Sequence, residues 1–174
     1  TGDIMNFEMA GEMAEAEGIK VDQVVVNDDV AVENSTWTTG RRGIAGTVLI
    51  HKIAGAKAQA GGSLEEVKAV AEKVIANVRS MGAALTPCIV PAAGKPTFTL
   101  AEDEIEIGMG IHGEPGTHRT HIMTADELVD TLMEKILIDL PYEAGDEVAV
   151  MINGLGATPL MEQFIMNHRV DQIL

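Results

Sequence analysis

Apolar residues recur at helical spacing in five stretches of the chain. They predict helices over residues 4–17, 44–60, 64–79 and 124–139, and from about 159 towards the end of the chain. Two of these helices begin with a capping box, in which a hydroxyl side chain and a glutamate three residues later bond each other's backbone amides. The pairs are Ser63 with Glu66 and Thr124 with Glu127.

Between the helices, β-branched or alternating apolar residues predict strands over 21–26, 81–91, 104–112 and 148–152. The first is expected to be a buried parallel strand. The order of helices and strands predicts an α/β fold of two domains, with mixed, largely parallel sheets flanked by helices. We place residues 1–90 in the first domain, a linker over 91–98, and residues 99–174 in the second.

The segment 104–116 has the sharpest pattern, because aliphatic residues alternate there with glutamate, glycine and finally His112. Gly108 and Gly110 precede the histidine on the same face and remove bulk, which favours the close approach of a ligand. The Gly/Pro turn of 113–116 should end the strand and place the imidazole at its terminus, on a rigid support. A histidine at a strand end can also simply bond a nearby carbonyl, and the pattern alone leaves both interpretations open.

Other polar groups have ordinary explanations. Asp3 stands at or beside the N-cap of the first helix. Asp28 and Asp29 follow the first strand, and a solvated turn there is favoured over a metal site. Arg41 and Arg42, in the basic segment 38–43, could bind phosphate or carboxylate as a fork or form pairs between subunits, but a structural role is favoured.

A loop after the central strand is expected to carry His118, Arg119 and His121. His118 and His121 could in principle chelate zinc, yet a structural zinc site needs four ligands at defined spacing, so no metal is expected. The turn at 153–159 enters a helix as anion-binding loops do. It matches neither the P-loop nor the dinucleotide fingerprint, so nucleotide binding by this chain is not expected.

The chain has 174 residues, 46% of them apolar, and a formal net charge of −15. This composition is globular. The charge argues against nucleic-acid and anionic-membrane partners, and it suits a soluble cytoplasmic protein or one with a basic partner. The single cysteine, Cys88, excludes an intrachain disulfide and is expected to be a buried thiol in a reducing compartment.

The motif at 106–116, preceded by the segment 90–100, closely resembles the substrate-binding subunit of bacterial dihydroxyacetone kinase. The segments 1–8, 26–32, 39–45, 91–96 and 153–160 resemble the same family in the same order, so the resemblance spans the chain. The family's subunit extends further at both ends. The resemblance therefore implies the second part of an N-terminal domain and the first part of a C-terminal one, each incomplete here.

In that family the histidine of the motif binds the ketone carbon of dihydroxyacetone covalently, which implies a hemiaminal on His112. The resemblance makes Asp3 the carboxylate that binds the terminal hydroxyl and takes its proton. One small substrate would then touch both side chains, which should lie within roughly 10 Å of each other.

The resemblance also implies a partner subunit that carries ADP or ATP with Mg, recharged through a phosphoenolpyruvate relay; some relatives use ATP on a fused chain. A homodimer is expected, although the residues themselves leave the oligomeric state open. Where the family has two arginines and a proline, this chain has His118–His121, which puts partner docking near that loop in doubt.

Two further interpretations stay open beside the kinase. Some relatives bind dihydroxyacetone through the same histidine but act as transcriptional coactivators without phosphoryl transfer. Alternatively, the chain is a plain structural α/β module in which Asp3 caps a helix and His112 makes a core bond. The kinase subunit is preferred.

Overall fold

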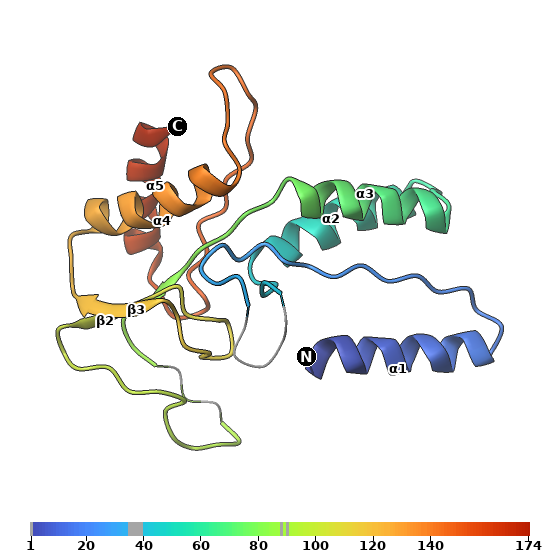
Figure 1. Cartoon of the computed structure of the whole chain (residues 1–174), viewed down its shortest axis with the longest axis horizontal. Coiled ribbons are helices and arrows are strands. Elements are labelled where there is room, and N and C mark those ends of the chain that lie inside the picture. The colour runs from blue at the N-terminus through green and yellow to red at the C-terminus, as the bar shows by residue number, and fades with distance from the viewer. Residues whose placement is uncertain (1, 35–39, 88, 90) are drawn as a thin grey trace. The chain divides into compact units, whose positions relative to one another are not determined.

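The computed structural model describes residues 2–34, 40–87, 89 and 91–174. The described residues form two compact units, the first within 1–29 and 33–78 and the second within 30–32 and 79–174 (Figure 1). The predicted domain limits, with a linker over 91–98, stay a prediction. Cys88 lies outside the described residues, so the expectation of a buried thiol is not addressed by the structure. Parts of the segments 1–8 and 38–43 also lie outside them.

The first unit consists of three helices, α1 (Gly2–Ala16), α2 (Gly46–Gln59) and α3 (Leu64–Ala76), all three of which were predicted. Helices α2 and α3 pack together around the buried side chains of Ile50, Ala71 and Val78. The capping box of α3 is confirmed, since the Ser63 hydroxyl accepts from the Glu66 amide at 3.2 Å and the Glu66 carboxylate accepts from the Ser63 amide at 3.0 Å. The apolar spacing and the capping box that predicted this helix pair thus correspond to a real core and a real cap.

The prediction of a buried parallel strand over 21–26 is wrong, because no strand is formed there. Val24 and Val26 pack against the core of the first unit, while Val25 is 55% exposed. A strand requires a second strand to pair with its backbone, and none of the described strands pairs with this segment. The β-branched composition therefore indicated partial burial correctly but not sheet pairing.

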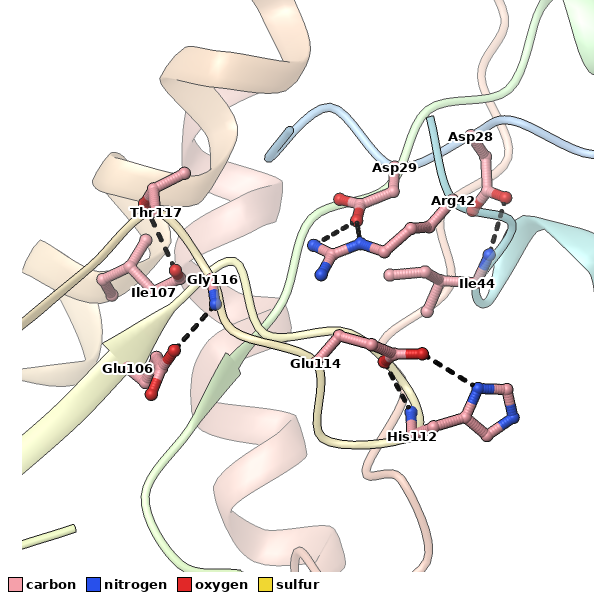
Figure 2. Close-up of polar contacts among 10 residues, drawn as sticks. All are labelled: Asp28, Asp29, Arg42, Ile44, Glu106, Ile107, His112, Glu114, Gly116 and Thr117. Atoms are coloured by element: carbon pink, nitrogen blue, oxygen red, sulfur yellow. Dashed lines mark hydrogen bonds and ion pairs between the residues drawn. The ribbon is translucent and has the colours of Figure 1, made fainter. Parts of the chain in front are cut away.

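Asp28 and Asp29 are fully buried, so the predicted solvated turn is also wrong. The Asp28 carboxylate accepts hydrogen bonds from the backbone amides of Ile44 and Gly46, both at 2.9 Å (Figure 2). The Asp29 carboxylate pairs with the Arg42 guanidinium, whose Nε and Nη2 both lie 2.6 Å from Oδ2. This confirms the structural role favoured for Arg42, since the ion pair joins the segment after α1 to the one before α2.

The second unit contains a three-stranded sheet in the order β1 (Ala83–Ala84), β2 (Glu104–Ile107) and β3 (His118–His121). The predicted helices α4 (Ala125–Asp139) and α5 (Leu160–Ile173) are present and pack together. The capping box of Thr124 with Glu127 is confirmed at the start of α4. Helices and sheet together confirm the α/β class. Both strand pairs are antiparallel, however, unlike the mixed, largely parallel sheets that were predicted.

Three strand predictions need correction. The central strand ends at Ile107 instead of reaching residue 112, and among the described residues of 81–91 only Ala83 and Ala84 form β1. The segment 148–152 is not a strand, whereas the predicted loop at 118–121 is β3. At Gly108 the backbone has a positive φ of 76°, and a Cβ there would lie 2.6 Å from the Cβ of Ala31. The missing side chain of Gly108 therefore lets the backbone turn and pack closely against Ala31. The space it leaves is filled by the protein itself and not by a ligand.

The segment 108–117 between β2 and β3, here called the His112 loop, is closed at its base by hydrogen bonds to the last residues of β2. The Thr117 amide donates to the Ile107 carbonyl at 2.8 Å, and the Gly116 amide donates to Oε1 of the buried Glu106 at 2.7 Å (Figure 2). Oε2 of Glu106 accepts from Nε of Arg119 at 3.1 Å. Both ends of the loop are therefore tied to the strand that precedes it.

Among the helices in the described part of the chain, none is long and apolar enough to cross a membrane.

Replacing Gly116 should break the base of the His112 loop. A Cβ at this position would lie 2.0 Å from the Ile107 carbonyl oxygen, so G116A must displace backbone. We expect a loss of about 1–3 kcal/mol in the free energy of unfolding, measured by urea titration. G82A is the matched control, because a Cβ at Gly82 meets nothing within 4 Å. Equal stability of the two variants would contradict this account of the loop.

Replacing Arg42 should destabilise the first unit strongly. R42A leaves the buried Asp29 carboxylate without its guanidinium, which should cost about 3 kcal/mol in the free energy of unfolding. The exposed pair of Lys20 with Glu65 provides a control, since K20A should change stability little or not at all. If urea titration gives the same small change for both variants, the buried pair is not a main support of this unit.

Candidate functional site

The His112 loop presents an exposed imidazole on an internally bonded turn. Within the loop the Gly110 amide donates to the Glu114 carbonyl at 2.9 Å, and the Gly113 amide donates to the Gly110 carbonyl at 3.0 Å. The His112 side chain is 69% exposed, while Met109 at the start of the loop is buried. His112 therefore lies five residues beyond the end of β2, on a turn and not at the strand terminus that was predicted. The support comes from the loop's own hydrogen bonds.

One carboxylate, that of Glu114, holds both the backbone and the ring of His112. Oε2 accepts from the His112 amide at 3.0 Å, and Oε1 lies 3.1 Å from Nδ1 of the ring (Figure 2). An ionised carboxylate can only accept, so Nδ1 must supply the hydrogen of this bond. In the neutral ring Nε2 then carries the lone pair, and Figure 2 shows it on the side of the ring away from Glu114. An unprotonated, exposed imidazole nitrogen is a competent nucleophile.

Glu114 is suited to stay ionised in this position. Partial burial by itself raises the pKa of Glu114, but the carboxylate accepts hydrogen bonds from its own amide and from the amide and ring of His112. These bonds outweigh burial, so the pKa of Glu114 lies below its ordinary value. At neutral pH the histidine thus faces a full negative charge at Nδ1.

Asp3, the second predicted site residue, lies in the first turn of α1 and is exposed, which confirms its place at the start of that helix. It belongs to the first unit, whereas His112 belongs to the second. The separation of the two side chains and their sharing of one substrate stay predictions.

His118 and His121, which were expected on a loop, lie in β3 and contact nearby side chains. Nδ1 of His118 lies 3.0 Å from the Thr117 hydroxyl oxygen, and Nδ1 of His121 lies 2.8 Å from a carboxylate oxygen of Asp103. Residues three apart in a strand point to opposite faces, so the pair could not chelate one ion as considered. Across the described residues there is no group of three or more His, Cys, Asp or Glu side chains that could hold a metal.

Sequence reasoning missed Glu106 and Glu114. Both were treated as polar positions of a strand or a turn, although each accepts a hydrogen bond from a backbone amide of the His112 loop. The signal available for Glu114 was its place two residues after a histidine inside a Gly/Pro turn, where a side chain can bond the backbone locally.

The comparisons with known proteins agree with one another. The Dak1 domain model matches residues 1–174. A relative in Listeria innocua, the dihydroxyacetone-binding subunit of a PTS-dependent dihydroxyacetone kinase, is 59% identical over the whole chain, which covers 53% of that relative. The chain thus spans about half the length of this and another curated relative that it matches.

Two solved structures are similar as well. The dihydroxyacetone kinase of C. freundii superposes with a TM-score of 0.85 at 35% identity, over 98% of this chain and 31% of that one. A dihydroxyacetone kinase operon co-activator superposes with a TM-score of 0.88 at 35% identity, over 98% of this chain and 53% of that one. With a family model that matches every residue and a relative of this identity, the chain belongs to the Dak1 domain family.

Proposed function

We propose that this chain supplies the dihydroxyacetone site of a kinase subunit. His112 binds the ketone carbon as a hemiaminal, and Asp3 acts as the base on the terminal hydroxyl during phosphoryl transfer. The observation that carries the proposal is the exposed imidazole on an internally bonded loop, with Nδ1 facing a carboxylate and Nε2 on the opposite side of the ring (Figure 2). The names of the relatives, which include dihydroxyacetone-binding subunits, support the choice of substrate.

A covalent bond suits this substrate because a three-carbon ketone offers few atoms for recognition. Addition of the Nε2 lone pair to the carbonyl carbon forms one bond and fixes the whole molecule. Glycerol lacks a carbonyl group and cannot undergo the addition, so the same step selects for the ketone.

The Asp3 carboxylate would do a different task from the imidazole. A hydroxyl becomes a competent phosphoryl acceptor when a carboxylate orients it and accepts its proton, while positioning and charge stabilisation supply most of the remaining effect. Exposure of Asp3 at the start of α1 leaves its oxygens accessible to such a group.

In this proposal the nucleotide, ADP or ATP with Mg, is bound by a partner subunit, consistent with a chain that carries no P-loop motif. A phosphoenolpyruvate-dependent phosphoryl donor is supported by relatives whose names describe PTS-dependent or PEP-dependent kinases. A cytoplasmic homodimer is proposed on the family resemblance alone.

The coactivator remains the second candidate function, because the superposition on an operon co-activator is as good as that on the kinase. Such a protein would bind dihydroxyacetone through His112 but transfer no phosphoryl group. Phosphorylation of bound dihydroxyacetone by a nucleotide-binding partner distinguishes the two functions.

One prediction of the proposed function concerns the covalent bond. Full-length protein incubated with dihydroxyacetone labelled with carbon-13 at the ketone should show a hemiaminal carbon signal by NMR and a matching mass increase in native mass spectrometry. H112A should lose both, because no other group replaces the attacking nitrogen. H121A is the matched control, since His121 is equally an exposed histidine of the second unit, and it should keep both signals. An adduct that survives in H112A would contradict the proposal.

A second prediction separates Asp3 from His112. D3N keeps the shape and hydrogen bonding of the side chain but removes the base, so turnover should fall roughly a hundredfold while the adduct on His112 persists. E12Q changes another exposed carboxylate of α1 and should leave turnover unchanged. Parallel loss of adduct and turnover in D3N would instead make Asp3 a binding or structural residue.

A distance between the Asp3 and His112 side chains far above roughly 10 Å, within the chain and across any dimer, would remove Asp3 from the mechanism.

A further inference from the structure

We propose that Glu114 is the positioning residue of His112: it fixes the ring with its hydrogen on Nδ1 and so presents Nε2 as the attacking nitrogen. This inference rests on the proposed function of His112. It goes beyond that function because it assigns a role to a second side chain and to a particular protonation state of the ring.

The geometry of the carboxylate carries the argument. Its two oxygens are both used, Oε2 by the His112 amide at 3.0 Å and Oε1 by the ring nitrogen Nδ1 at 3.1 Å. The bond to the amide fixes the carboxylate against the backbone of the same residue whose ring it holds. The ring orientation is therefore tied to the loop backbone, and the bond at Nδ1 determines which nitrogen keeps its lone pair.

The same carboxylate matches the charge that the addition creates. As Nε2 bonds to the ketone carbon, the electron pair of the C=O double bond moves to oxygen, which takes up a proton. The ring becomes an imidazolium that still carries its Nδ1 hydrogen, and loss of that hydrogen leaves a neutral substituted imidazole. The overall change is the addition of N and H across the carbonyl, so no further reactant is needed. Glu114 faces the developing positive charge and the hydrogen that must leave.

A purely structural role is the alternative, in which Glu114 only holds the loop through the His112 amide. The two roles differ in what E114Q should do. Glutamine offers one acceptor and one donor in place of two acceptors. If its carbonyl oxygen keeps the bond to the amide, its NH₂ group faces Nδ1 and donates to it, which moves the ring hydrogen to Nε2. The variant should therefore invert the tautomer while keeping the loop.

The experiment measures the tautomer and the adduct on the same full-length protein. Nitrogen-15 NMR of labelled histidine should show Nδ1–H and a bare Nε2 for His112 in the wild type, and Nε2–H in E114Q. The equilibrium constant for the carbon-13 adduct should fall about tenfold in E114Q, the loss expected for one charge-assisted hydrogen bond. E147Q, which changes another exposed carboxylate of the second unit, should match the wild type in both measurements.

Each outcome decides one of the two proposals. Wild-type tautomer and wild-type adduct formation in E114Q would overturn the positioning role and leave the function of His112 intact. An Nε2–H ring in the wild type would overturn it as well. Absence of the adduct in the wild type would defeat the proposed function, while the tautomer comparison would still test Glu114. If E114Q unfolds, E114A, which lacks both acceptors, should still form less adduct than E147Q; equal adduct formation would count against the role.

Discussion

The placement of the reactive histidine depends on the return of the chain onto the end of β2. The His112 loop leaves the strand at Gly108 and comes back at Thr117, whose amide bonds the carbonyl of Ile107, the last residue of β2. Gly116 fits this return only because it has no side chain, as the Ile107 carbonyl occupies the space where a Cβ would stand. The loop is thus short and closed at its neck, so hydrogen bonds within it are sufficient to fix the exposed ring.

In these loops carboxylate side chains accept the hydrogen bonds of backbone amides, as the carbonyls of a neighbouring strand do in a sheet. Asp28 accepts the amides of Ile44 and Gly46, Glu106 accepts the amide of Gly116, and Glu114 accepts the amide of His112. Backbone amides that turn away from a ladder need an acceptor, and a carboxylate offers two oxygens at once. Part of the net charge of −15 is therefore internal and structural, and it should not be counted as a surface field.

Local signals were predictable from the sequence, and long-range pairing was not. The helices and both capping boxes depend on residues three or four apart, and each was found where expected. The strand limits depend on partners far along the chain. The alternation at 104–112 continues past Ile107, but Gly108 adopts a positive φ that no polar or apolar pattern encodes. His112 was identified by residue type and motif. The position of Glu114 two residues after the histidine permitted a local bond to the backbone, but only the structure shows that its carboxylate also contacts the ring.

An exposed loop is usually mobile, yet the His112 loop must hold its exposed ring in place. Two carboxylates do this, Glu106 by fixing the base of the loop and Glu114 by fixing the ring. Glu106 is buried and holds the neck of the loop together with Arg119, so it can position backbone but cannot touch a ligand. Glu114 is partly exposed and holds the imidazole itself, so it can influence the ring's protonation. A nucleophile on this loop needs both, because a fixed backbone with a freely rotating ring would present either nitrogen, and a fixed ring on a mobile loop would not stay in place. Glu106 binds the backbone at the base of the loop and Glu114 binds the backbone and ring of His112, so neither glutamate can replace the other.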